Sequence, residues 1–157
     1  MNDQHLLFLR TGLTPRAIQL LSTHIEGGNT PTIRTCQRWF NGEKTPRNGI
    51  VGIAAYLDLV MTNYAVDVCR EYTEVLNIIT FDDDDELWNE HPSMMPLSAS
   101  VHSALVNRII TIAQLNNIDV GTITNSREPS MQDWNSIANI FITTNHIPDI
   151  GKMVTHN

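Results

Sequence analysis

Apolar residues recur along most of the chain at intervals of three to four positions, the spacing typical of amphipathic helices. In the first half this pattern predicts helices over residues 3–10, 15–25, 31–40 and from 46 to about 60. The last pattern continues to Leu76, with or without a break. In the second half the predicted elements are helices over 98–116 and 130–141 and a short extended piece over 118–123. The pattern therefore predicts a mainly α fold.

The boundaries of these helices are marked by turn and capping residues. Thr-Pro occurs at positions 14–15, 30–31 and 45–46, and each pair reads as a capping hydroxyl followed by a proline in the first turn. Gly42 stands where a left-handed residue would end the third helix. Residues 82–86 (DDDDE) predict a solvated acidic turn or helix start, and residues 91–96 predict a loop between two prolines.

The third predicted helix, residues 31–40, combines an apolar side with two arginines. The apolar side carries Ile33, Cys36, Trp39 and Phe40, and the other directions carry Arg34, Thr35, Gln37 and Arg38. Guanidinium groups bind phosphates and guanine edges in bidentate fashion, so this helix is a candidate for reading nucleic acid. The alternative interpretation of the same segment is an ordinary amphipathic surface helix.

Charge is distributed unevenly, although the net charge of −7 at first argues against a nucleic-acid partner. Residues 10–47 hold six basic and two acidic side chains, so 6 − 2 = +4, whereas residues 81–157 hold three and ten, so 3 − 10 = −7. Salt screens surface charges beyond about 8 to 10 Å, so a distant acidic half does not cancel a local basic face. The asymmetry predicts an N-terminal anion-binding face and an acidic C-terminal region with another role.

Composition narrows the setting of the protein. No apolar run approaches the roughly 18 residues that a membrane span needs, and the N-terminus lacks the basic head of a signal peptide. Cys36 and Cys69 each lie in an apolar pattern without a CxxC or a histidine-rich neighbourhood. We therefore expect a cytoplasmic protein with two buried free thiols and no cofactor.

Two other classes of protein compete with a nucleic-acid-binding one. A metal-dependent enzyme could use the oxygen and nitrogen ligands of Asp82, Asp83, Asp84, Asp85, Glu86, Glu90, His91 and His102. Consecutive aspartates point in different directions, however, and the HExxH, EF-hand, GxSxG and phosphate-loop patterns are missing, so we expect neither a metal site nor an enzyme. The other alternative is an antitoxin-like interaction module, whose acidic half masks a partner while its head binds DNA.

The order of helix, helix, loop, arginine-bearing helix and turn resembles the helix-turn-helix of Cro/C1-type phage repressors. Residues 35–42 (TCQRWFNG) look like the end of that family's recognition helix and its turn, with Cys36 and Trp39 in the core positions. The resemblance covers residues 3–62. It implies a helix-turn-helix domain over residues 1–64, followed by an acidic, mainly helical dimerisation region over 65–157. One departure is that residues 22–29 add length between the second and third helices: either the second helix is longer, or residues 26–28 bulge.

Carried over residue by residue, the resemblance implies a DNA-binding set made up of Arg16, Thr32, Ile33, Arg34, Thr35, Arg38, Asn41, Lys44 and Arg47. Of these, Ile33, Arg34 and Arg38 would face base edges in the major groove, and Thr32 or Thr35 would bond a phosphate or a base. Arg16 would bind a phosphate at the start of the second helix. Asn41, Lys44 and Arg47 would bind the DNA backbone beyond the end of the third helix. Trp39 would be the packing centre.

A single head touching three or four phosphates binds weakly, so the resemblance also implies a homodimer whose heads reach half-sites about 34 Å apart on double-stranded DNA. The Ile/Val/Leu stripe of the C-terminal helices, with Trp134 and Phe141, is the candidate dimer surface. The whole layout is also similar to small regulators of the anti-CRISPR-associated type, which favours a repressor of its own operon. The acidic half remains a candidate surface for a protein partner.

Overall fold

The structure, a computed structural model, describes residues 2–27, 29–47, 49–71 and 75–124. The helix expected over 130–141 and the expected dimer contacts of Trp134 and Phe141 lie outside this range. The described helices are α1 (Asp3–Thr11), α2 (Pro15–Glu26), α3 (Ile33–Phe40), α4 (Ile50–Glu71), α5 (Asp84–Glu90), the 3₁₀ turn η1 (Pro92–Met94) and α6 (Ala99–Leu115). The described strands are β1 (Val75–Ile79) and β2 (Asp119–Thr124). The chain is mainly helical, as the apolar spacing predicts.

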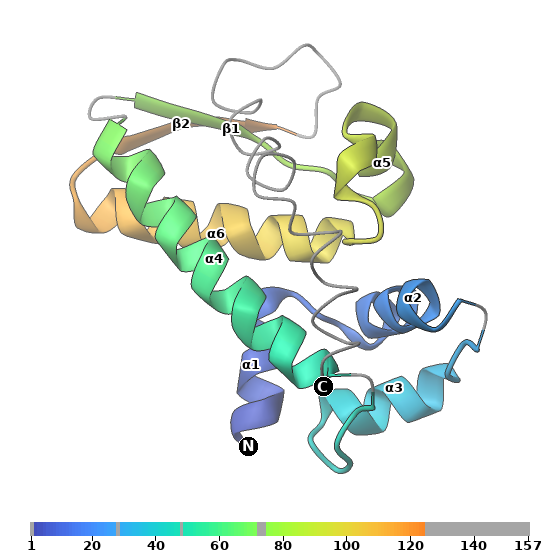
Figure 1. The fold of residues 1–157 in the computed structure, drawn as a ribbon. Coiled ribbons are helices and arrows are strands. Elements are labelled where there is room, and N and C mark those ends of the chain that lie inside the picture. The colour runs from blue at the N-terminus through green and yellow to red at the C-terminus, as the bar shows by residue number, and fades with distance from the viewer. Residues whose placement is uncertain (1, 28, 48, 72–74, 125–157) are drawn as a thin grey trace.

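The two longest helices, α4 and α6, cross and form the centre of the molecule (Figure 1). The small sheet lies on one side of α6, and α1, α2 and α3 lie on its other side (Figure 1). α1 packs against α3, α4 and α6, so it connects the N-terminal helices with the rest of the fold. α3 packs against α2 at the end of the molecule farthest from the sheet (Figure 1).

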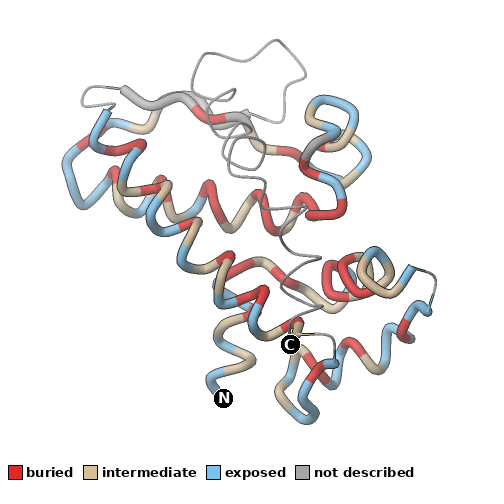
Figure 2. The backbone as a smooth tube through the Cα atoms, viewed as in Figure 1, coloured by how far each residue is buried: buried red, intermediate tan, exposed pale blue. Residues whose placement is uncertain are grey.

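One continuous cluster of buried side chains joins the N-terminal helices to α6. It includes Phe8 and Trp39 from the first part of the chain, Leu57 from α4, and Leu105 and Ile109 from α6. Figure 2 shows this burial as red segments along the facing sides of α4 and α6. α4 runs without interruption through residues 64 and 65, so the boundary expected between two domains falls inside a helix whose two ends share this core.

The strand β1 was missed by the helical interpretation of the pattern, which carried the fourth helix on to Leu76. β1 instead pairs in parallel with β2, which corresponds to the extended piece expected over 118–123. The partners include Val75 with Asp119 and Ile79 with Thr124, and an irregularity shifts the register between Leu76 and Ile78. Parallel strands need a crossover connection, which α5, η1 and α6 supply here.

Two helix starts were placed too early. α3 begins at Ile33 with Thr32 as its cap, so Thr30 and Pro31 lie outside the helix. α4 begins at Ile50 rather than Pro46, because Gly49 adopts a φ of +67°, a left-handed conformation that cannot continue an α-helix. The predicted first-turn proline is confirmed at α2, where the Thr14 hydroxyl accepts from the Ala17 N–H and Pro15 opens the helix.

α4 is 22 residues long and, among the described helices, is the one long and apolar enough to span a membrane by length and composition. The sequence expectation concerned an unbroken apolar run, and the apolar sequence of α4 is interrupted by Asp58 and Asp67, so α4 meets the criterion only by its average composition. The same criterion is met by core helices, and α4 has the features of one. It buries Ile53, Leu57 and Met61, and its Asp58 forms ion pairs with Arg10 of α1 and Arg108 of α6.

Part of the acidic run organises the start of α5. Asp83 caps this helix by accepting from the Glu86 N–H at 2.8 Å, which confirms the helix start predicted from the sequence. Asp84 Oδ1 accepts from the Ala99 N–H at 2.7 Å and so ties α5 to the first turn of α6. Carboxylates next to the first turns of two helices are also favoured by the helix dipole.

Both cysteines, Cys36 and Cys69, are buried free thiols, as expected from the sequence.

The apolar stripe of α6 serves the core of the chain itself. Val101, Leu105, Ile109 and Ala113 are buried, and α6 packs on α4. This stripe is therefore not the exposed dimer surface that the sequence interpretation assigned to it.

His102 on α6 makes the stability of the fold depend on pH. Its side chain is 1% exposed and lies edge-on to Phe81, with ring centroids 5.8 Å apart. Burial, together with the nearby His91, lowers the pKa of His102 from 6.5 to about 3. As the pH falls below 6.5 the unfolded chain binds a proton at this position and the folded protein does not, so the free energy of unfolding decreases between pH 6.5 and about 3.

The expected slope from this histidine is about 1 kcal/mol per pH unit, measured by urea denaturation between pH 7 and pH 5. The variant His102→Leu should flatten that slope by this amount. An identical slope in wild type and His102→Leu would contradict the prediction.

Candidate nucleic-acid interface

The connection between α2 and α3 is held by side chains of α2. Gln19 Nε2 donates to the Pro31 carbonyl at 3.0 Å, and the Thr23 hydroxyl donates to that of Thr30 at 3.1 Å. α2 extends to Glu26, one residue beyond its expected end, and ends at Gly27, which has a φ of +69°. Residue 28, part of the alternative bulge over 26–28, lies outside the described residues. Six residues, 27–32, then lead to α3.

The first turn of α3 is closed by its own threonines. The Thr32 hydroxyl accepts from the Thr35 N–H at 3.2 Å, and the two hydroxyl oxygens lie 3.0 Å apart. Thr32 is exposed and Thr35 is half-buried. The hydroxyl groups of both threonines therefore take part in the hydrogen bonds that cap the N-terminal end of α3.

Trp39 and Cys36 hold α3 against the rest of the protein, as the sequence predicts. The Trp39 side chain is 4% exposed and the Cys36 side chain is fully buried. Burial raises the pKa of the Cys36 thiol to about 11, so this group is a packed, protonated thiol rather than a nucleophile. Over the indole lies the Arg47 guanidinium, whose carbon is 5.4 Å from the ring centroid.

Arg47 also pairs with the end of α2. Its Nε donates to Glu26 Oε1 at 2.7 Å and its Nη2 to Oε2 at 3.3 Å, and the hydrogen bonds to Glu26 raise the pKa of Arg47. This guanidinium was expected to grip a DNA backbone. In the structure it is instead engaged in joining α2, Trp39 and the segment after α3.

The C-terminal end of α3 is bound by α1. Gln4 Nε2 donates to the carbonyls of Trp39 (2.6 Å) and Lys44 (2.9 Å), and the ring N–H of His5 donates to the Phe40 carbonyl at 2.7 Å. Gly42 adopts a φ of +77°, which confirms the left-handed residue predicted at the end of this helix. Carbonyl groups at and just beyond the end of α3 thus accept hydrogen bonds from side chains of another helix.

The exposed face of α3 carries most of the predicted DNA-binding set. Thr32, Ile33, Arg34, Gln37, Arg38 and Asn41 are all exposed. Arg34, Gln37, Arg38 and Asn41, with Glu43, line a surface hollow of about 440 Å³. Cys36 and Trp39 are the buried residues of this helix, and Figure 2 shows it with only short red segments. Arg34 and Arg38 are separated by one helical turn, so both guanidinium groups lie on one side of the helix.

Two residues of this face were missing from the predicted set. Gln37 shares the face because it lies three residues after Arg34 and next to Arg38, a spacing that could have identified it. Glu43 lies beyond the helix end and forms an ion pair with Arg38 at 3.5 Å between Nε and Oε2. Both partners are about half exposed, and such pairs contribute under about 1 kcal/mol, so Arg38 can exchange Glu43 for another acceptor.

The remaining members of the predicted set lie around this face. Arg16 is exposed in the first turn of α2, and Lys44 is exposed just beyond α3. The structure thus brings Ile33, Arg34, Arg38 and Asn41 together on one helix surface, leaves Arg16 on a neighbouring helix, and commits Arg47 to Glu26.

No protein-family model matches the chain, and no match was found among curated proteins or among solved structures. Among the described residues, no three histidine, cysteine, aspartate or glutamate side chains form a group that could hold a metal ion. The class of the protein is therefore inferred from the geometry of α3 and its surroundings.

Proposed function

We propose that this protein is a sequence-specific double-stranded-DNA-binding regulator, in which α2 and α3 form a helix-turn-helix and α3 enters the major groove. The observation that supports this most is the exposed side of α3, where Arg34, Gln37, Arg38 and Asn41 line one surface while Cys36 and Trp39 anchor the opposite side. Eight residues of helix span about 12 Å, which fits within the major groove, itself about 12 Å wide.

The side chains on this face have the chemistry for base reading. Arginine is the usual partner of guanine O6 and N7, and glutamine pairs with adenine in the same bidentate way. Ile33 is 43% exposed at the start of α3, a position from which an apolar side chain can contact a thymine methyl group. Arg16 and Lys44 flank the helix and would hold phosphates, which fix orientation rather than sequence.

We propose that the protein acts as a homodimer and represses transcription, including that of its own operon. One helix-turn-helix offers few phosphate contacts. Two of them, bound to half-sites about 34 Å apart, would raise the affinity for DNA. Because the stripe of α6 is used inside the chain, the dimer surface is assigned to other parts of residues 65–157. We place the regulator in the cytoplasm, where its DNA and its two reduced thiols would be found.

Replacing Arg34 with alanine should weaken binding to the preferred duplex by about 1 to 3 kcal/mol, which is roughly a 5- to 150-fold rise in Kd, and relax the preference at one base pair. Fluorescence anisotropy with a labelled duplex selected from a random pool measures the change. Arg70→Ala removes the same charge at the far end of α4 and is the matched control. Equal losses in the two variants would contradict a reading role for Arg34.

Replacing Lys44 with alanine should weaken preferred and scrambled duplexes alike. Loss of one phosphate contact should also reduce the slope of log K against log salt by about 0.9. Anisotropy titrations of both duplexes at several salt concentrations measure this. A change confined to the preferred duplex would place Lys44 at a base edge instead.

A further inference from the structure

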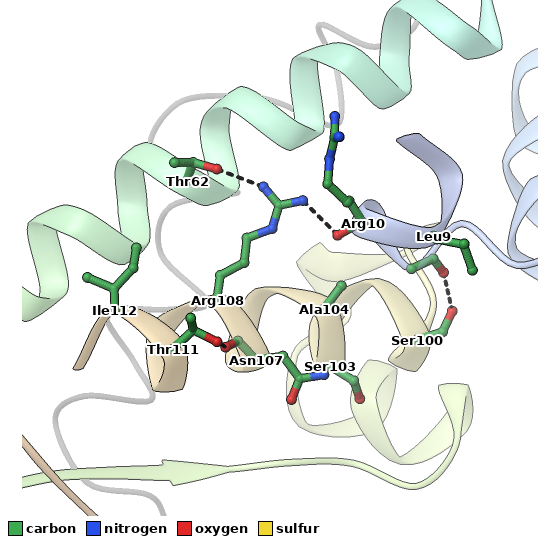
Figure 3. A pocket seen from close by; sticks show the side chains of 11 residues that line it. Leu9, Arg10, Thr62, Ser100, Ser103, Ala104, Asn107, Arg108, Thr111 and Ile112 are labelled. Atoms are coloured by element: carbon green, nitrogen blue, oxygen red, sulfur yellow. Dashed lines mark hydrogen bonds between the residues drawn. The ribbon is translucent and has the colours of Figure 1, made fainter. Parts of the chain in front are cut away.

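A groove lies between the C-terminal end of α1, the middle of α4 and one side of α6. Its volume is about 660 Å³, which falls within the range of small-molecule sites. Figure 3 shows Leu9 of α1 and Thr62 of α4 around the groove, with Ala104, Arg108 and Ile112 presented by α6. The groove lies apart from the exposed face of α3, and none of the residues that line it belongs to the predicted DNA-binding set.

The lining combines apolar surface with hydrogen-bonding groups and positive charge. Leu9, Ala104 and Ile112 supply the apolar part, and Ser103 and Asn107 lie next to each other on α6 (Figure 3). The lining also includes two guanidinium groups and no carboxylate: the Arg10 side chain is 57% exposed and that of Arg108 is 15% exposed. Asp58 pairs with both arginines, so 2 − 1 leaves one positive charge at this end of the groove.

The two arginines have different roles. Arg108 is fixed because it donates to the Arg10 carbonyl at 2.6 Å, to the Asp58 carbonyl at 2.6 Å and to the Thr62 hydroxyl at 2.8 Å. Arg10 reaches Asp58 from solvent through two contacts, Nη2 to Oδ2 at 3.1 Å and Nε to Oδ1 at 3.4 Å, and its side chain is the more exposed of the two guanidinium groups. Arg10 is therefore the cation of the two that a ligand in the groove can reach from the solvent side.

We propose that this groove binds a small amphipathic anion. The apolar body of the ligand lies against Leu9, Ala104 and Ile112, and its anionic group is bound by Arg10. Two guanidinium groups that share one carboxylate leave an excess of one positive charge beside apolar surface, which favours an anion over a neutral or cationic molecule of the same shape.

α1 connects this groove with α3, and this part of the inference rests on the proposed function. At its C-terminal end α1 is held by α6, since Arg108 donates to the Arg10 carbonyl and the Ser100 hydroxyl donates to the Gly12 carbonyl at 2.7 Å (Figure 3). At its N-terminal end, Gln4 binds the end of α3. A ligand that changes the position of α1 against α6 thus changes the support of the DNA-reading helix, which makes the groove a site for an effector.

The test uses two fluorescent probes of nearly the same shape. 1-Anilinonaphthalene-8-sulfonate carries an anion, and N-phenyl-1-naphthylamine has the same rings without the sulfonate. With the full-length protein we expect the sulfonate to bind about tenfold more tightly than the neutral probe, and Arg10→Gln to remove this difference by weakening only the sulfonate. Equal affinities of the two probes in wild type would overturn the assignment of an anion.

The location of the site is tested by filling the groove. Asn107→Trp places an indole in it from an exposed position of α6, and Gln114→Trp places the same side chain on the same helix outside the groove. We expect binding of the sulfonate to fall at least tenfold in the first variant and to stay within about twofold of wild type in the second. Similar binding in both variants would overturn the site.

These measurements contain no DNA, so their outcome is independent of the proposed function. Coupling is then tested by measuring the Kd for the selected duplex with and without saturating sulfonate. We expect a change of at least about fivefold in wild type and none in Asn107→Trp. Sulfonate binding in the groove with an unchanged Kd for DNA would overturn the effector role, and failure to bind any duplex would overturn the proposed function while leaving the binding site intact.

Discussion

Replacing Trp39 with alanine is expected to lower the free energy of unfolding by about 3 to 5 kcal/mol, because a nearly buried indole leaves a large cavity when it is truncated. The same substitution removes the ring on which the Arg47 guanidinium rests, and thereby one support of its pairing with Glu26. Since small domains are typically stable by only about 5 to 15 kcal/mol, much of the protein could then be unfolded at 37 °C. Urea denaturation followed by far-UV circular dichroism measures the change.

The matched control for Trp39→Ala is Ile33→Ala, which truncates a partly exposed residue of the same helix. It should change the free energy of unfolding by no more than about 0.5 kcal/mol. A loss of similar size in both variants would contradict the assignment of the buried indole as the packing centre of α3.

Replacing Gly12 with alanine is expected to destabilise the fold by about 2 to 5 kcal/mol. Gly12 has a φ of +70°, and a Cβ added there would meet the Ser100 carbonyl oxygen at 2.2 Å. The backbone of α6 would have to move away from α1, which would also strain the hydrogen bond from the Ser100 hydroxyl to the Gly12 carbonyl. Thermal and urea unfolding of the variant measure the loss.

Gly27→Ala separates the two causes of this loss. Gly27 has nearly the same φ, +69°, but a Cβ added there meets nothing within 4 Å. Only the left-handed backbone conformation is then penalised, and the expected destabilisation is about 1 to 2 kcal/mol. If Gly12→Ala were no more harmful than Gly27→Ala, α1 and α6 would not be packed as closely as described.

Helix boundaries that are marked by strong local signals could be predicted from the sequence. Boundaries that depend on long-range contacts could not. Thr14-Pro15 is a capping residue followed by a first-turn proline, and α2 begins there. Thr30-Pro31 has the same local pattern, yet its backbone and hydroxyl are bound by Gln19 and Thr23 of α2, so the cap moves to Thr32. A tertiary contact of this kind leaves no periodic trace in the sequence.

The strand β1 was hidden for a similar reason. Its partner β2 lies about forty residues further along the chain, and an apolar run of five residues is compatible with either a helix or a strand. The residues at 75, 78 and 79 are β-branched, which is a signal for a strand, but it was outweighed by the apolar spacing that continues from α4. The glycine at position 49 was a second signal in the sequence, because glycine readily adopts the left-handed conformation that delays the start of α4 beyond Pro46.

Much of the candidate site was visible in the sequence, because the buried positions of Cys36 and Trp39 and the exposed positions of Arg34 and Arg38 follow from helical spacing alone. The spacing could not reveal which arginines are already engaged. Arg47 has its partner Glu26 on another helix, and this pairing depends on how α2 ends. The groove beside α1 could not be predicted at all, since it is formed by three helices that are distant in sequence.

The most direct measurement of the central claim is a selection of preferred sites from a pool of random duplexes, carried out with wild type and with the double variant Arg34→Ala/Arg38→Ala. If α3 reads the major groove, wild type enriches one defined sequence and binds it at least about 100-fold more tightly than a scrambled duplex, and the double variant loses that preference while staying folded. Enrichment of no sequence by wild type, or of the same sequence by both proteins, would contradict the claim.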